Sequence, residues 1–139
     1  MANTFYSAYR NLLGTSTINL TTADIRVILI DSADYTFSAA HDFLDDVAAG
    51  ARVAVSANLA SKTFGTVAAG VFDAADISFT TVTGDQSEAL IIYCHDGGAD
   101  SARQLICFLD TGITGMPVTP NGGNINITWN ASGIFSIGG

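Results

Sequence analysis

The chain has few cations, and they are not clustered. Five of its 139 residues are lysine or arginine against thirteen aspartates and glutamates, so its formal net charge is -8. The cations are scattered along the sequence, at Arg10, Arg26, Arg52, Lys62 and Arg103. Nucleic-acid binding depends on clustered cations that displace counterions from phosphates. We therefore expect neither nucleic acid nor an anionic membrane as a partner.

Long apolar runs and a secretory leader are also missing. No apolar stretch approaches the roughly 20 residues that span a bilayer. The first residues, MANTFYSAYRNLLGTS, lack the basic start and apolar core of a signal peptide, so we expect synthesis in a cytoplasm. Only two cysteines occur, Cys94 and Cys107, and both lie in apolar runs. We expect buried free thiols, with a disulfide as the alternative.

The length and composition fit one domain with a neutral surface. A chain of 139 residues has room for one domain, here residues 1–139, with a core of its own. Charged residues make up only 13%, against about 25% in typical domains. A neutral surface is common where protein meets protein. A β-rich secreted domain has a similar composition, so the composition leaves both interpretations open.

Most of the sequence predicts short β-strands. ADIRVILID (23–31) is apolar on both faces, which indicates a central strand. From Arg52 onward, short runs alternate between apolar and polar residues, with turn signals every ten or so residues. In RVAVSANL (52–59), the alternation places Val53, Val55 and Leu59 on one buried face. The prediction is a mainly β fold, a β-sandwich or jelly-roll-like body over residues 16–139, with one or two short helices near the N-terminus.

The first helix is expected within residues 1–15, over residues 5–13 between a cap at Thr4 and a stop at Gly14. It carries three aromatic side chains within five residues: Phe5, Tyr6 and Tyr9. They either pack in the chain's own core or form an arm that docks on a neighbouring subunit, where aromatic residues contribute much of the binding energy. These three are the candidate partner-contact residues.

A second short helix is expected over residues 38–50, SAAHDFLDDVAAG. Ser38 is a suitable N-cap and Gly50 a suitable stop. The inward face would hold Phe43, Leu44 and Val47.

Both prolines, Pro117 and Pro120, lie in one short stretch, GMPVTPNGGNINITWN (115–130). Proline cannot donate a hydrogen bond to a strand ladder, so this stretch begins as a connection. Asn121-Gly122-Gly123 then suits a tight reversal. The alternation that follows places the only tryptophan, Trp129, in the core.

Acidic residues gather near a histidine, which raises the question of a metal site. His41 and Asp45 stand four apart on the expected helix, within a group that also holds Asp31, Asp34, Asp42 and Asp46. The His-Glu-x-x-His pattern is absent, and acids at a helix start also favour its dipole. HDGGAD (95–100) lacks the spacing of a calcium loop and fits a solvated hairpin tip. We therefore predict no metal.

No arrangement typical of an enzyme is found. The chain has no Gly-x-Ser-x-Gly elbow and no glycine-rich phosphate loop, and its histidines lie in separate acidic segments. Both cysteines fall inside expected strands rather than exposed electropositive pockets. The acids fall at strand ends, turns or helix starts, which does not favour a carboxyl with a raised pKa. We predict no catalytic residue and no cofactor.

Three segments together resemble small structural proteins of tailed-bacteriophage heads, a family that includes capsid decoration (cement) proteins. They are IRVILIDSADYTFSAAHDFLDDV (25–47), VFDAADISFTTVTGDQSEALIIYCHDGGAD (71–100) and RQLICFLDTGITGMPVTPNGGNINITW (103–129). The most specific part is DTGITGMPVTPNGGNINITW (110–129), with its spacing of proline, asparagine and glycine before the alternation that ends at Trp129. The resemblance covers nearly the whole chain.

This resemblance implies a non-enzymatic virion protein with a β-sandwich or jelly-roll fold. Its expected partners are the phage major capsid protein and further copies of itself, with a dimer favoured over a trimer. It would bind the outer capsid surface between capsid subunits and stabilise the shell. The alternative is a tail or fibre component that binds a host surface or a glycan. A hydrolase or metal-dependent enzyme has only the acidic group around His41 in its favour.

Overall fold

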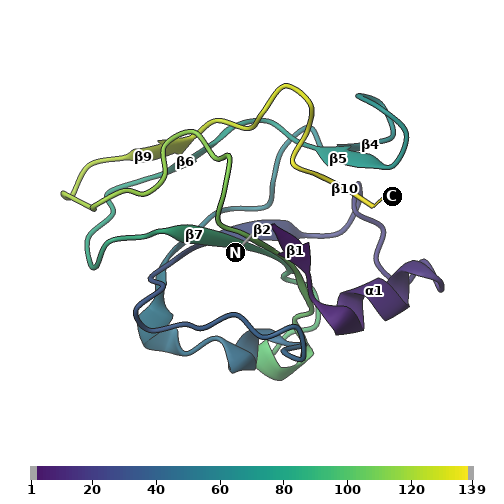
Figure 1. Ribbon diagram of the computed structural model, residues 1–139, viewed down its shortest axis with the longest axis horizontal. Helices are drawn as coiled ribbons and strands as arrows, with labels where there is room; N and C mark the ends of the chain where they lie inside the picture. The colour runs from purple at the N-terminus through teal and green to yellow at the C-terminus, as the bar shows by residue number, and fades with distance from the viewer. Residues whose placement is uncertain (1–2, 138–139) are drawn as a thin grey trace.

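The computed structural model describes residues 3–137. Its largest sheet has five strands, and each strand is antiparallel to its neighbours (Figure 1). In spatial order they are β1 (Thr4–Phe5), β8 (Leu105–Leu109), β7 (Ala89–Cys94), β2 (Ile25–Ile30) and β3 (Arg52–Val55).

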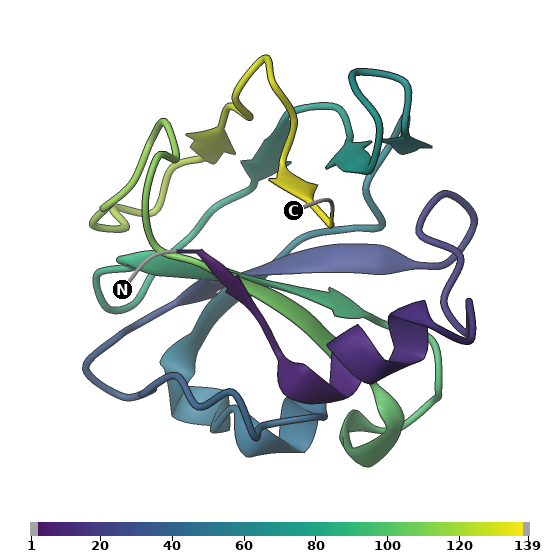
Figure 2. The same ribbon diagram turned by 45° about the vertical axis from the view of Figure 1, so that its right-hand side comes forward.

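Two small antiparallel sheets form a second layer on one face of the five-stranded sheet (Figure 2). One sheet has three strands and the other has two: β10 (Phe135–Ser136), β5 (Val71–Asp73) and β4 (Thr63–Phe64), then β6 (Ile77–Phe79) and β9 (Ile125–Ile127). The fold is therefore mainly β with antiparallel pairing, as the sequence predicts.

The opposite face of the large sheet is covered by irregular chain and short 3₁₀ turns. The α-helix α1 (Ser7–Leu13) lies beside the sheet at one end. The 3₁₀ turns are η1 (Leu44–Asp46), η2 (Ala49–Ala51) and η3 (Asp100–Ala102). No helix within residues 3–137 is long and apolar enough to cross a bilayer.

The centre of the large sheet is buried on both faces. Every residue of β7 and β8 is buried, as are five of the six residues of β2. Because side chains alternate across a strand, these residues divide between two hydrophobic clusters. Val27 and Ile92 pack toward the small sheets, whereas Ile28 and Ile91 pack toward the 3₁₀ turns. The prediction of a central strand over 23–31 is confirmed.

β3 departs from the predicted facing at one residue, Val55, whereas Val53 packs against the core cluster that contains Leu59. Val55 is 45% exposed, whereas the next residue, Ser56, is only 7% exposed. The Ser56 hydroxyl accepts a hydrogen bond from the Val27 backbone N–H and donates one to the carbonyl of Ala57. These bonds satisfy a buried polar side chain at the edge of the sheet. The prediction of an inward Val55 was therefore wrong, while Leu59 is buried as expected.

The first helix is shorter than predicted and has a different N-terminus. It begins at Ser7, its N-cap is Tyr6 without a side-chain hydrogen bond, and Gly14 caps its C-terminus as expected. Thr4 and Phe5 instead form β1, paired with Phe108 and Cys107 of β8. The free edge of β8 binds these two residues, and strand pairing replaces the first helical turn.

The second predicted helix, over residues 38–50, does not form. Its backbone pairs with the segment after η3: the Leu44 N–H donates to the Arg103 carbonyl, and the Leu105 N–H to the Asp42 carbonyl. The Arg52 guanidinium then donates to the carbonyls of Leu44 and Val47. These long-range bonds occupy groups that a helix would use internally. Leu44 and Val47 still point inward, as expected.

The proline-containing stretch is a connection, as predicted. It joins β8 to β9, and within it Val118 forms an isolated antiparallel bridge with Ser87. Gly122 has a φ of 87°, the left-handed conformation that glycine tolerates. The Asn121 side-chain oxygen accepts from the Gly123 N–H and closes the turn. The turn therefore sets the start of β9.

Trp129, just after β9, is buried, and its indole N–H donates to the Ala75 carbonyl. Trp129→Ala would leave a large cavity and an unpaired carbonyl between the layers. We expect a loss of about 3–5 kcal/mol in unfolding free energy, measured by guanidinium denaturation. Asn126→Ala, at an exposed position of β9, should change stability by less than about 0.5 kcal/mol. Equal stability of the two variants would contradict this placement of Trp129.

Candidate functional site

The three N-terminal aromatic residues belong to the core of the chain itself. Tyr6 and Tyr9 are fully buried, and Phe5 is partly buried. Tyr6 packs on the face of the large sheet that carries the 3₁₀ turns, whereas Tyr9 packs on the face toward the small sheets. Phe5 contacts Phe135 edge to face, with ring centroids 5.1 Å apart. The prediction of Tyr6 and Tyr9 as partner contacts is thus corrected.

Tyr6 and Tyr9 differ in how their hydroxyl groups are satisfied. The Tyr6 hydroxyl lies 2.9 Å from that of Tyr35, which lies 2.9 Å from Nδ1 of His41. Burial and the hydrogen bond with Tyr35 raise the pKa of Tyr6 above its ordinary value. The Tyr9 hydroxyl is buried and has no hydrogen-bond partner. Burial raises the pKa of Tyr9 to about 12, so it remains a neutral hydroxyl and a donor at neutral pH.

The acidic residues near His41 do not converge on a metal site. His41 contacts Tyr35, and an Asp46 oxygen accepts from the Asp42 N–H. The carboxylates that do come together are Asp31, Asp34 and Asp85, whose oxygens lie within 4.8 Å of one another. One Asp31 oxygen already accepts from the Ala33 N–H in a turn. Sequence reasoning did not include Asp85, which lies far from the other two along the chain.

The carboxylates of the β7–β8 loop, which contains HDGGAD (95–100), bind the loop to neighbouring segments. Asp100 forms ion pairs with Arg52 and Arg103, at 2.8 and 3.1 Å, and its hydrogen bond with Arg52 lowers the pKa of this carboxyl. Asp96 accepts from the Asp24 N–H. Gly97 packs so closely that a Cβ would lie 2.6 Å from the Ala102 carbonyl oxygen. The loop is exposed at its tip, as predicted, and its carboxylates have structural contacts.

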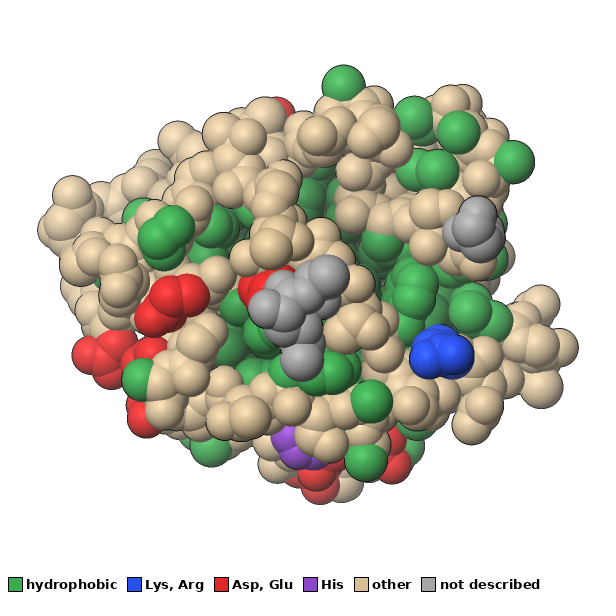
Figure 3. All heavy atoms as spheres, viewed as in Figure 1, with side chains coloured by type: hydrophobic (Ala, Val, Ile, Leu, Met, Phe, Trp, Pro, Cys, Tyr) green, Lys and Arg blue, Asp and Glu red, His purple; other side chains and the backbone are tan. Residues whose placement is uncertain are grey.

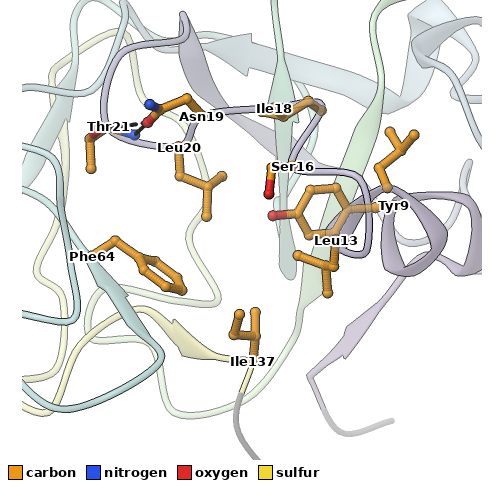
Figure 4. Close-up of a pocket in the computed structure, with 10 residues that line it drawn as sticks. Tyr9, Leu13, Ser16, Ile18, Asn19, Leu20, Thr21, Phe64 and Ile137 are labelled. Carbon is orange, nitrogen blue, oxygen red and sulfur yellow. Dashed lines mark hydrogen bonds between the residues drawn. The ribbon is translucent and has the colours of Figure 1, made fainter.

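A cleft of about 400 Å³ lies between α1 and the three-stranded sheet (Figure 4). We call it the interlayer cleft. Its walls come from α1, the loop over residues 16–21, β4 and the chain just after β10. The lining residues are Tyr9, Leu12, Leu13, Ser16, Ile18, Asn19, Leu20, Thr21, Phe64 and Ile137. Tyr9 lies at the inner wall, and its hydroxyl points toward the space of the cleft.

Two exposed apolar residues lie at the mouth of this cleft. Phe64 and Ile137 line it and are 38% and 39% exposed. Val67, in the loop between β4 and β5, is also exposed. We call Phe64, Val67 and Ile137 the hairpin-end patch. Figure 3 shows apolar side chains around this end of the molecule and acidic side chains gathered on the other side of the same view.

Sequence reasoning did not find the cleft or the patch. The loop over residues 16–21, Phe64 and Ile137 are separated by long stretches of chain, and none belongs to a recognised motif. Tyr9 was singled out only as one of three aromatic residues. The only local indication of the patch in the sequence is a pair of large apolar residues, Phe64 and Val67, in a short segment without other large side chains.

Comparison with known proteins does not add an assignment. Neither the protein-family models nor the curated proteins match this chain. The structure therefore defines the class, a mainly β domain of antiparallel sheets, and the functional assignment is a proposal.

Both cysteines are free and buried, as the sequence predicts. Burial raises the pKa of the Cys107 thiol to about 12 and also raises the pKa of Cys94. Because the thiolate is the reactive form, neither should react with Ellman's reagent at pH 8 while the chain is folded. Both should react in guanidinium. Fast reaction of either thiol in the native protein, at the rate of free cysteine, would contradict the burial of β7 and β8.

Proposed function

We propose that this chain is a non-enzymatic structural protein of a tailed-bacteriophage head. In this proposal it is a capsid decoration protein that binds the outer surface of the shell between major capsid protein subunits. The observation that carries the proposal is the sequence resemblance over nearly the whole chain, above all the motif within residues 110–129.

The charges of the chain agree with a partner that is protein rather than nucleic acid. Arg26 pairs with Asp24 at 2.9 Å, and Arg52 and Arg103 both pair with Asp100. Three of the five cations are thus neutralised by neighbouring acids. Phosphate binding needs cations free to replace counterions, whereas a protein interface favours apolar and neutral groups at its centre.

The hairpin-end patch is the surface that we assign to the capsid contact. Its three residues are apolar and exposed: Phe64 belongs to one edge strand, β4, Val67 to the loop that follows it, and Ile137 comes just after the other edge strand, β10. When a partner covers large apolar side chains that are exposed in the free protein, their removal from water contributes favourably to the free energy of binding. The binding free energy of each subunit is small, but the contributions of many copies on one shell add together. Because the protein would bind the mature shell and not its dissociated subunits, it would stabilise the shell by mass action.

The finer fold assignment belongs to the same proposal. A β-sandwich or jelly-roll-like arrangement is expected for this family, and the two layers of antiparallel sheet agree with it. We further propose that the protein forms a homo-oligomer, a dimer before a trimer, because closed symmetric assemblies are the common case. It would be made in the host cytoplasm and reside on the outer capsid surface of the virion.

The test is rebinding to phage heads stripped of this protein, followed by sedimentation and electron microscopy. Wild-type protein should return as regular density on the outer shell and raise the temperature at which heads open. Val67→Asp should weaken rebinding by about tenfold or more, because an interface would bury an unpaired charge. Val55→Asp is the matched control, since Val55 is equally exposed but belongs to a strand of the other layer.

Two outcomes would overturn the proposal. One is a failure of the folded wild-type protein to bind heads, together with its recovery in purified tails, which would favour a tail or fibre component. The other is equal loss of rebinding in both valine variants, which would remove the hairpin-end patch from the contact. Circular dichroism of each variant separates these outcomes from unfolding.

A further inference from the structure

The Tyr9 hydroxyl is an uncompensated group in the folded chain. It is buried without a hydrogen-bond partner within the described residues, and Tyr9 is 1% exposed, so bulk water does not satisfy it. Buried polar groups are nearly always paired, because an unpaired one has lost its hydrogen bonds to water. An unpaired hydroxyl on the wall of a cleft is therefore a reason to ask what enters that cleft.

The walls of the cleft are mostly apolar and uncharged, with Ser16, Asn19 and Thr21 as polar side chains besides Tyr9. The cleft walls include Leu13, Ile18 and Leu20 and, at the mouth, Phe64 and Ile137. No charged side chain lines the cleft within residues 3–137. An ionic occupant would lose its hydration without gaining a countercharge. A neutral occupant with a mostly apolar body matches these walls.

The polar groups near the mouth are largely engaged with one another. The Asn19 side-chain oxygen accepts from both the backbone N–H and the hydroxyl of Thr21, which fixes the loop that forms one wall. The Tyr9 hydroxyl has no such contact. Burial raises the pKa of Tyr9 to about 12, so at neutral pH its hydroxyl keeps its proton and can donate a hydrogen bond to an acceptor oxygen. The matching group on an occupant is a carbonyl or ether oxygen.

We propose that the interlayer cleft binds a small, neutral, mostly apolar molecule whose carbonyl or ether oxygen accepts a hydrogen bond from Tyr9. The volume of about 400 Å³ is within the range of small-molecule sites. The depth of Tyr9 favours a slim molecule over a peptide laid across the surface, and the side chains that cover the hydroxyl in the free chain would move apart to admit it. This inference is independent of the capsid proposal.

The experiment titrates the full-length protein with prodan, a neutral aromatic ketone whose emission moves to shorter wavelength in apolar surroundings. Wild type should show saturable binding at one site. Tyr9→Phe should weaken binding about fivefold to tenfold, the effect of one neutral hydrogen bond. The same variant should melt no lower than wild type, because it removes a hydroxyl that has no partner in the free protein.

Tyr93→Phe is the matched control. Tyr93 is equally buried, lies outside the cleft, and its hydroxyl is 2.8 Å from Nδ1 of His95. This variant should lower the melting temperature through the lost hydrogen bond and leave the prodan affinity within about twofold of wild type. A second cleft variant, Phe64→Ala, should weaken prodan binding by removing an apolar wall.

Three results would overturn the inference: no saturable emission change with wild type, equal prodan affinity in Tyr9→Phe and wild type, or a Tyr9→Phe protein that melts well below wild type. The last result would show that the hydroxyl is satisfied within the folded chain. Protein that coats phage heads but does not bind prodan would remove the ligand site and leave the capsid proposal standing.

Discussion

Burial of the central sheet on both faces is the constraint on which the rest of the structure depends. β7 and β8 contain no exposed residue, so each face needs its own covering layer. The small sheets supply one layer, and the irregular chain with η1 and η2 supplies the other. The two layers differ in kind because the second is held by hydrogen bonds to the segment after η3, and not by helical or sheet periodicity.

The same constraint explains why the aromatic N-terminus is not an arm. The outer edge of β8 pairs with β1, and this pairing places Tyr6 and Tyr9 at the margin of the sheet, one on each face. The Tyr9 ring covers the edge of the hydrophobic cluster on one face, and the Tyr6 ring covers that on the other. On the side of Tyr9 the closure is incomplete, because α1 and the three-stranded sheet meet at a cleft rather than in close packing. The candidate ligand site is thus a consequence of how the two layers end.

The sequence predicts the local features of this fold better than its long-range ones. Continuous apolar runs identified β2, β7 and β8 and the two buried thiols, and alternation identified Trp129 as a core residue. The helix over residues 38–50 was wrong because Asp42 and Leu44 make backbone hydrogen bonds to residues 103–105 in place of helical ones. Likewise Val55 was misplaced because Ser56 bonds to a neighbouring strand. The cleft depends on segments brought together only by the tertiary fold, which no local pattern encodes.

The most direct test of this account is native-state hydrogen exchange of the free protein. If two-sided burial of the central sheet holds the fold together, the amides of β7 and β8 should exchange most slowly, and only through global unfolding. The β4–β5 hairpin, with its exposed tip, should exchange faster through local opening. Exchange of β7 amides as fast as those of the hairpin would contradict the account, because the sheet would then not be the element that both layers stabilise.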